Sequence, residues 1–170
     1  VDLNDGEALM RQKPRKAQER LFSRGGLYCT LFYGCLIGLI SLAAFLMGPC
    51  MLLHARGERI HLESLSLLLR REEILTRAQT YAFTVLGMSQ LYHAVGMRDV
   101  QCSVLRMNHL ENKLMLAAFA IGIGLQVLVT EFPYFVTAFG TCRLTPEEWM
   151  QLILLATAPL LAHELLILTK

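Results

Sequence analysis

YCTLFYGCLIGLISLAAFLMGPCMLL, residues 28–53, contains no charged side chain. About 20 apolar residues in a helix cross the roughly 30 Å hydrocarbon core of a bilayer. Lipid offers the backbone no hydrogen-bonding partner, so such a run is expected to be helical. The stretch therefore predicts a membrane-spanning helix. Gly34 and Gly38 within it either permit close approach of another helix or are simply tolerated facing lipid.

Three further apolar segments follow, at about residues 77–97, 113–130 and 149–168. Composition agrees, because 54% of residues are hydrophobic and only 18% are charged, whereas soluble domains are about 45–50% apolar. We expect an all-α membrane fold, a bundle of four transmembrane helices over residues 28–170. Residues 1–27 are expected to form a cytosolic loop and basic arm.

An even number of crossings places both termini on one side of the membrane. The basic arm decides which side, because loops rich in Lys and Arg stay in the cytoplasm. Its cations are Arg11, Lys13, Arg15, Lys16, Arg20 and Arg24. Both termini are therefore predicted to be cytoplasmic. The start at Val1, within a polar stretch and without a signal peptide, leads us to expect a piece of a longer protein.

The connecting segments carry helix signals of their own. In residues 54–76, Leu62, Leu65, Leu68 and Leu69 recur at helical spacing, which predicts a short amphipathic helix at the membrane interface. Thr145 and Pro146 have the pattern of an N-cap and first helical position, and Trp149 suits the interface. Asn112 suits an N-cap before the third span. Pro159 should kink the fourth span.

Polar side chains inside the spans are the candidate functional residues, because burying them in lipid is costly. They are Ser89, Gln90, His93, Gln126, His163 and Glu164. Gln90 and His93 share a helix face, and an amide oxygen can replace a water ligand of a hard cation. Hydrogen bonding between helices is the alternative, and spacing alone favours it. Glu164 is better explained as an interfacial charge than as an ion ligand.

Other functional classes have little support. The net charge of +2 and the lack of a nucleic-acid-binding signature argue against nucleic acid as a partner. Five cysteines without a CxxC pair predict neither a disulfide framework nor a zinc site. No phosphate-binding loop, nucleophile elbow or HExxH motif occurs, so no catalytic residue is assigned. From the residues alone, this membrane module could transport, scaffold or regulate.

Several short motifs resemble, in order, the C-terminal transmembrane region of type II P-type cation-transporting ATPases, the calcium-pump group. Met10 with Pro14-Arg15 resembles the M-x-x-x-P-R that ends a cytosolic coupling loop. AQTYAF, residues 78–83, resembles the start of the eighth transmembrane helix. QLYHA, residues 90–94, is similar to the Q-L-x-H-A of bacterial members. Further matches are Ser103-Val104, Asn112, Leu125-Gln126, Phe139, Leu144, Trp149 and His163-Glu164.

The resemblance implies transmembrane helices seven to ten of an ATP-driven pump, with Ca²⁺ as the expected cation. The parent would use Mg²⁺ and ATP, but the D-K-T-G-T phosphorylation motif is absent here, so this segment should hold no cofactor and catalyse nothing alone. Expected partners are the bilayer, the remaining helices and the phosphorylation domain, in a bacterial plasma membrane. Alternatives are a Na⁺, Mn²⁺ or H⁺ pump, or a membrane scaffold or regulator.

The resemblance also singles out Gln90 as the candidate metal-binding residue. In the animal reticulum pumps of this group, the matching position of the eighth helix is a glutamate that contributes to a calcium site. An amide can coordinate through oxygen but brings no negative charge. The substitution leads us to expect fewer calcium sites than in those pumps, or a different ion or proton stoichiometry.

Overall fold

The computed structural model describes residues 26–97 and 113–168 of the chain. Within these ranges all regular elements are helices. They are α2 (Gly26–Ala55), α3 (Leu62–Leu69), α4 (Glu72–Gly96), α5 (Lys113–Glu131), α6 (Pro133–Phe139), α7 (Pro146–Ala156) and α8 (Ala158–Leu168). The all-α prediction is confirmed for this part of the chain.

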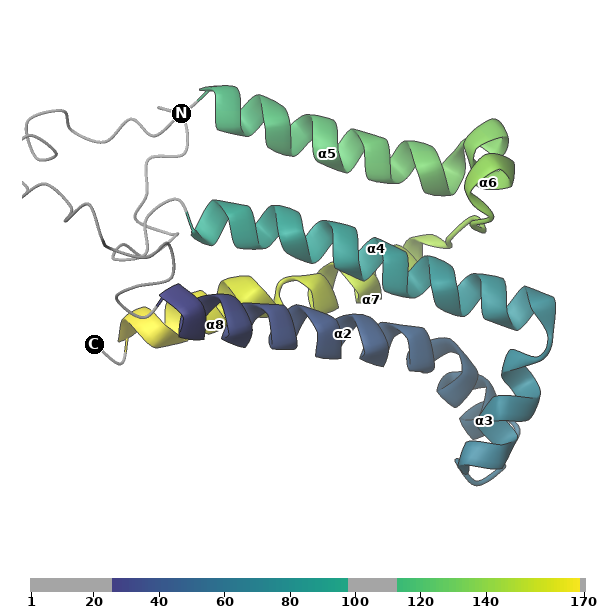
Figure 1. Cartoon of the computed structure of the whole chain (residues 1–170). Coiled ribbons are helices and arrows are strands. Elements are labelled where there is room, and N and C mark those ends of the chain that lie inside the picture. Colours follow the sequence, from purple (N-terminus) through teal and green to yellow (C-terminus); the bar gives the residue numbers. More distant parts are fainter. Residues whose placement is uncertain (1–25, 98–112, 169–170) are drawn as a thin grey trace, which may run out of the picture.

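Four long helical segments lie side by side and alternate in direction (Figure 1). They are α2, α4, α5 and the pair α7–α8. The first residue of α2 and the last of α8 lie at the same end, together with the end of α4 and the start of α5. The short helices α3 and α6 lie at the opposite end. We call this opposite end the α3–α6 end.

Three of the segments are long and apolar enough to cross a membrane, among the residues described: α2, α5 and the run Pro146–Leu168. The second predicted span, at about residues 77–97, lies in α4, which is about 37 Å long but is not among these three helices. It is more polar than the others, since its first two turns contain Glu72, Glu73 and Arg77. Helix α4 contacts each of the other long segments, namely α2, α5, α7 and α8.

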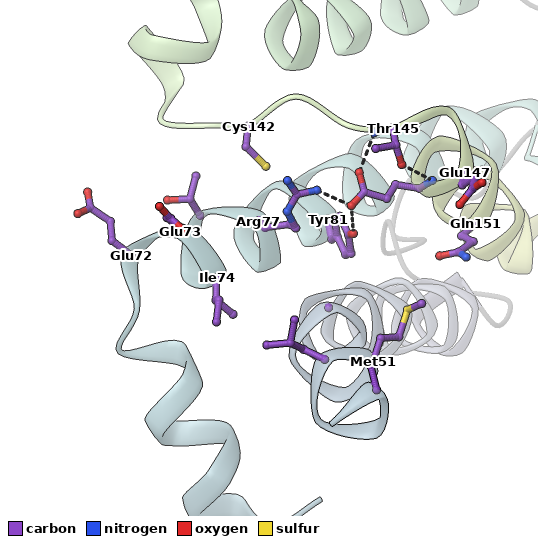
Figure 2. Close-up of a pocket in the computed structure, with 15 residues that line it drawn as sticks. Met51, Glu72, Glu73, Ile74, Arg77, Tyr81, Cys142, Thr145, Glu147 and Gln151 are labelled. Atoms are coloured by element: carbon purple, nitrogen blue, oxygen red, sulfur yellow. Dashed lines mark hydrogen bonds and ion pairs between the residues drawn. The ribbon is translucent and has the colours of Figure 1, made fainter. Parts of the chain in front are cut away.

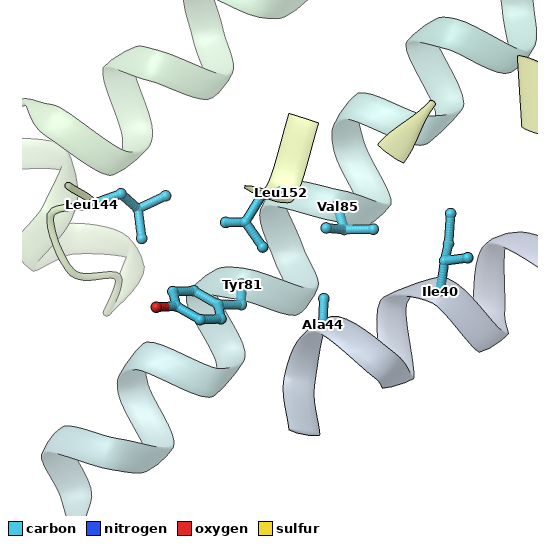
Figure 3. Packing of buried hydrophobic residues seen from close by; sticks show 6 residues of the cluster. All are labelled: Ile40, Ala44, Tyr81, Val85, Leu144 and Leu152. Carbon is cyan, nitrogen blue, oxygen red and sulfur yellow. The ribbon is translucent and has the colours of Figure 1, made fainter. Parts of the chain in front are cut away.

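A cluster of buried hydrophobic residues joins α2, α4 and the start of α7 (Figure 3). Its buried residues are Ile40, Ala44, Tyr81, Val85, Leu144 and Leu152. Small and large side chains alternate here: Ala44 and Val85 are fully buried, and the Tyr81 ring lies over Gly48, where an added Cβ would be 3.5 Å from the ring. By contrast, α5 packs mainly on α4 and α6. The described helices thus form a compact group of three with α5 attached through α4.

The connections follow their sequence signals in part. Thr145 forms the predicted cap, accepting a hydrogen bond from the Glu148 N–H while the Glu148 carboxylate accepts one from Thr145 N. The fourth span breaks at Thr157, next to Pro159, as predicted from the proline. The amphipathic helix predicted within residues 54–76 is α3. Helix α6 was not predicted from the sequence, although Pro133 marks its start and Gly140, at φ 63°, marks its end.

The close-contact glycines differ from the pair considered in the sequence. A Cβ added to Gly34 or Gly38 would meet no atom of the described residues within 4 Å. At Gly122 an added Cβ would lie 2.6 Å from the Leu91 side chain, and at Gly87 it would lie 2.6 Å from Gln126 Oε1. Gly87 and Gly122 therefore set the spacing between α4 and α5.

Candidate functional site

Gln90 lies on a stripe of α4 that the described helices leave exposed. The stripe recurs at helical spacing along α4 and just past its end, and consists of Gln79, Phe83, Leu86, Gln90, Ala94 and Met97. The other faces of α4 carry its buried residues, including the hydroxyl side chains of Thr80, Thr84 and Ser89. Gln90 thus lies on a side of α4 that the described helices do not cover.

The two polar neighbours of Gln90 point elsewhere. Ser89 is fully buried, and its hydroxyl donates to the Leu86 carbonyl at 3.0 Å. His93 is half-buried, and its ring centroid lies 4.3 Å from that of Tyr33 on α2, with the planes 38° apart. The structure therefore does not bring Gln90 and His93 together on one ligand.

Gln126 joins α5 to α4. Its Nε2 donates to Thr84 Oγ1 at 3.3 Å, and its side chain is 8% exposed. The absence of a side chain on Gly87 makes room for the amide oxygen. The buried Thr130 hydroxyl donates back to the Gln126 carbonyl at 2.9 Å. This geometry fits the interpretation that Gln126 packs helices together, and Gln126 lies apart from the exposed stripe.

His163 and Glu164 lie on α8. His163 is 3% exposed and packs over Gly96, where an added Cβ would lie 3.4 Å from the imidazole. Glu164 is half-buried. Pro14 and Arg15, the residues predicted to couple to a cytosolic domain, lie outside the described residues, as does Asn112.

A polar junction that sequence reasoning missed joins α4 to the start of α7 (Figure 2). Glu148 Oε1 accepts hydrogen bonds from the Arg77 guanidinium, with which it forms an ion pair, and from the Tyr81 hydroxyl. Glu148 Oε2 accepts from Thr145 N at 2.7 Å. No local sequence pattern could reveal this junction, because Tyr81 and Arg77 precede Glu148 by 67 and 71 positions.

An open pocket of about 890 Å³ lies beside this junction, between α2, α4 and α7. Its apolar lining includes Met51, Leu52 and Ile74, and its polar lining includes Arg77 and Gln151. Carboxylates also line it: Glu72, Glu73, Glu147 and Glu148. Its lining comes from the last turns of α2 and the first turns of α4 and α7, which lie at the α3–α6 end (Figure 1), whereas Gln90 is in the last turns of α4.

Among the described residues, no group of three or more His, Cys, Asp or Glu side chains is arranged to hold a metal ion. Gln90 can supply one neutral oxygen, whereas a calcium ion takes six to eight oxygen ligands. An ion at Gln90 would therefore need most of its ligands from beyond the described residues.

Comparison with known protein families shows which family the chain belongs to. Residues 4–169 match the model described as "Cation transporting ATPase, C-terminus". The chain belongs to this family. Its membership accounts for the apolar helices and for the order of the short motifs, and it confirms the resemblance to the C-terminal region of calcium-type P-type pumps.

Two relatives of this cation-ATPase segment come from bacteria. It is 34% identical over 176 residues to "Calcium-transporting ATPase 1" of Bacillus cereus, covering 100% of this chain and 18% of that protein. It is 30% identical over 168 residues to "Calcium-transporting ATPase" of Bacillus subtilis, covering 98% of this chain and 16% of that protein. The chain thus spans less than a fifth of the length of these relatives.

Proposed function

We propose that this chain is the C-terminal transmembrane segment of an ATP-driven cation pump of a bacterial plasma membrane, with Ca²⁺ as the transported ion. Family membership and two relatives named as calcium transporters support the proposal. The remaining helices and a cytosolic phosphorylation domain, which would use Mg²⁺ and ATP, belong to the rest of the pump. This segment supports the ion path and supplies one residue to it.

That residue is Gln90, and its exposure on α4 carries the assignment. A glutamine inside a membrane is costly unless a protein or hydrated surface receives it. The described helices cover Ser89 and Gln126 but leave Gln90 open. We infer that helices of the remaining pump cover the stripe and place the amide oxygen beside the ion.

The proposed topology has four crossings, with α4 as the second and both termini in the cytoplasm. The alternating directions of α2, α4, α5 and α7–α8 support it. In this arrangement α3 and α6 lie on the outer side of the membrane.

The test is Gln90→Ala in the full-length protein, measured as the Ca²⁺ dependence of phosphorylation by ATP and of transport into vesicles. We expect the Ca²⁺ concentration for half-maximal phosphorylation to rise. Gln79→Ala, which shortens another exposed amide on the same stripe, is the control and should have no effect. An unchanged Ca²⁺ dependence in Gln90→Ala would exclude coordination. Repeating the assay with Mn²⁺, Na⁺ and altered pH distinguishes the other cations.

A further inference from the structure

The pocket between α2, α4 and α7 lies at the level where the apolar helices end. Met51 and Leu52 belong to the last turns of α2, and charged residues begin at Arg56. Glu72 starts α4, and Pro146 starts α7. All three helix ends meet at the pocket, so its apolar wall adjoins the hydrocarbon core and its charged rim reaches the headgroup layer.

The wall facing the hydrocarbon is suited to an acyl chain. Met51 and Leu52 are 52% and 36% exposed, and Ile74 extends the same lining from α4. Methionine side chains adapt to irregular apolar shapes, which suits a flexible chain.

The rim is suited to a head that carries both charges. Arg77 gives one nitrogen to Glu148, and its side chain is 44% exposed, so its other N–H donors can reach a phosphate. In Figure 2 it is drawn between Glu73 of α4 and Glu147 of α7. Both carboxylates are exposed, and among the described residues neither forms an ion pair.

We propose that this pocket binds a phospholipid with a primary ammonium headgroup, of the phosphatidylethanolamine type. The phosphate lies at Arg77, the ammonium donates to Glu73 or Glu147, and an acyl chain covers Met51, Leu52 and Ile74. A primary ammonium has three N–H donors for these carboxylates, whereas the quaternary ammonium of phosphatidylcholine has none. An anionic headgroup would meet repulsion, because four carboxylates and a single arginine line the pocket.

The test is lipid retention by the full-length protein in nanodiscs holding equal amounts of phosphatidylethanolamine and phosphatidylcholine. Lipids that survive mild delipidation are counted by native mass spectrometry. Exposed ion pairs are weak, so we expect phosphatidylethanolamine to be enriched roughly twofold to fivefold. Glu73→Gln and Glu147→Gln together should reduce the enrichment to parity. Glu63→Gln on α3, exposed but outside the pocket, should leave it unchanged.

Other results would overturn the proposal. Equal retention of both lipids by the unaltered protein would show that the rim does not select the ammonium. Enrichment that persists in the double variant, or that is lost equally in Glu63→Gln, would place the lipid elsewhere. Displacement of the lipid by millimolar phosphoethanolamine would show that the apolar wall contributes nothing. The measurement needs no ion transport, so its outcome is independent of the proposed pump function.

Discussion

The Tyr81 hydroxyl donates a hydrogen bond to Glu148 Oε1 and thereby joins α4 to the first turn of α7. Arg77 reaches the same oxygen from one turn earlier on α4, and Thr145 N reaches the other oxygen. One carboxylate therefore fixes the relative height of α4 and α7, next to the core formed around Ala44 and Leu152.

We predict that Glu148→Ala lowers the stability of the full-length protein by about 2–3 kcal/mol, because it leaves Arg77 and Tyr81 without their acceptor. Thermal inactivation in nanodiscs measures the change. Glu63→Ala removes an exposed carboxylate of α3 that lies outside the pocket, and should shift the transition little. Equal shifts in the two variants would show that the junction contributes nothing.

Loss of the α7 N-cap should lower the stability of the protein by less than loss of the Glu148 junction. Thr145→Ala removes the hydroxyl that accepts from the Glu148 N–H, and such losses typically cost about 1 kcal/mol. Thr145→Ser keeps the hydroxyl and should restore most of the thermal stability. If the serine variant melts with the alanine variant, the contribution of Thr145 lies in its methyl group instead.

The α4–α5 contact should be sensitive to a single methyl group. Gly122→Ala places a Cβ within 3.4 Å of three atoms of Leu91, so the helices must separate or Leu91 must change rotamer. Overpacking of this kind costs about 1–3 kcal/mol. Gly124→Ala, two residues along α5, meets nothing within 4 Å among the described residues and is the matched control. Thermal unfolding of the two variants in the same nanodiscs compares them, and a similar midpoint for both would mean that α5 packs more loosely than described.

The proposed topology can be tested by cysteine labelling in intact cells. In a cysteine-free background, Ser66→Cys on α3, Thr137→Cys on α6 and Leu168→Cys on α8 are all exposed positions. With α4 crossing the membrane, an impermeant maleimide labels positions 66 and 137 from outside, and position 168 only after permeabilisation. If α4 does not cross, positions 137 and 168 exchange their accessibility.

The sequence was sufficient for features that depend on local composition. Apolar length located α2, α5 and the run containing α7 and α8, and the Thr145 and Pro159 signals fixed a start and a break. The sequence did not indicate that α4 lies in contact with all the other long segments, because hydrophobic periodicity does not show which helices surround a given segment. The junction at Glu148 and the close approach at Gly87 and Gly122 could not be predicted from the sequence either. Each joins residues that only tertiary packing brings together.

The polar character of α4 also has a consequence for membrane insertion during synthesis. The charged first turns of α4 and its buried hydroxyl groups give it a weaker tendency to enter lipid than α2, which has no charge over residues 28–53. Helix α2 is synthesised before α4, and its residues Ile40 and Ala44 pack in one buried cluster with Tyr81 and Val85 of α4. In the proposed topology we expect the translocon to release the two helices as a hairpin, so deletion of α2 should leave α4 outside the bilayer during biosynthesis.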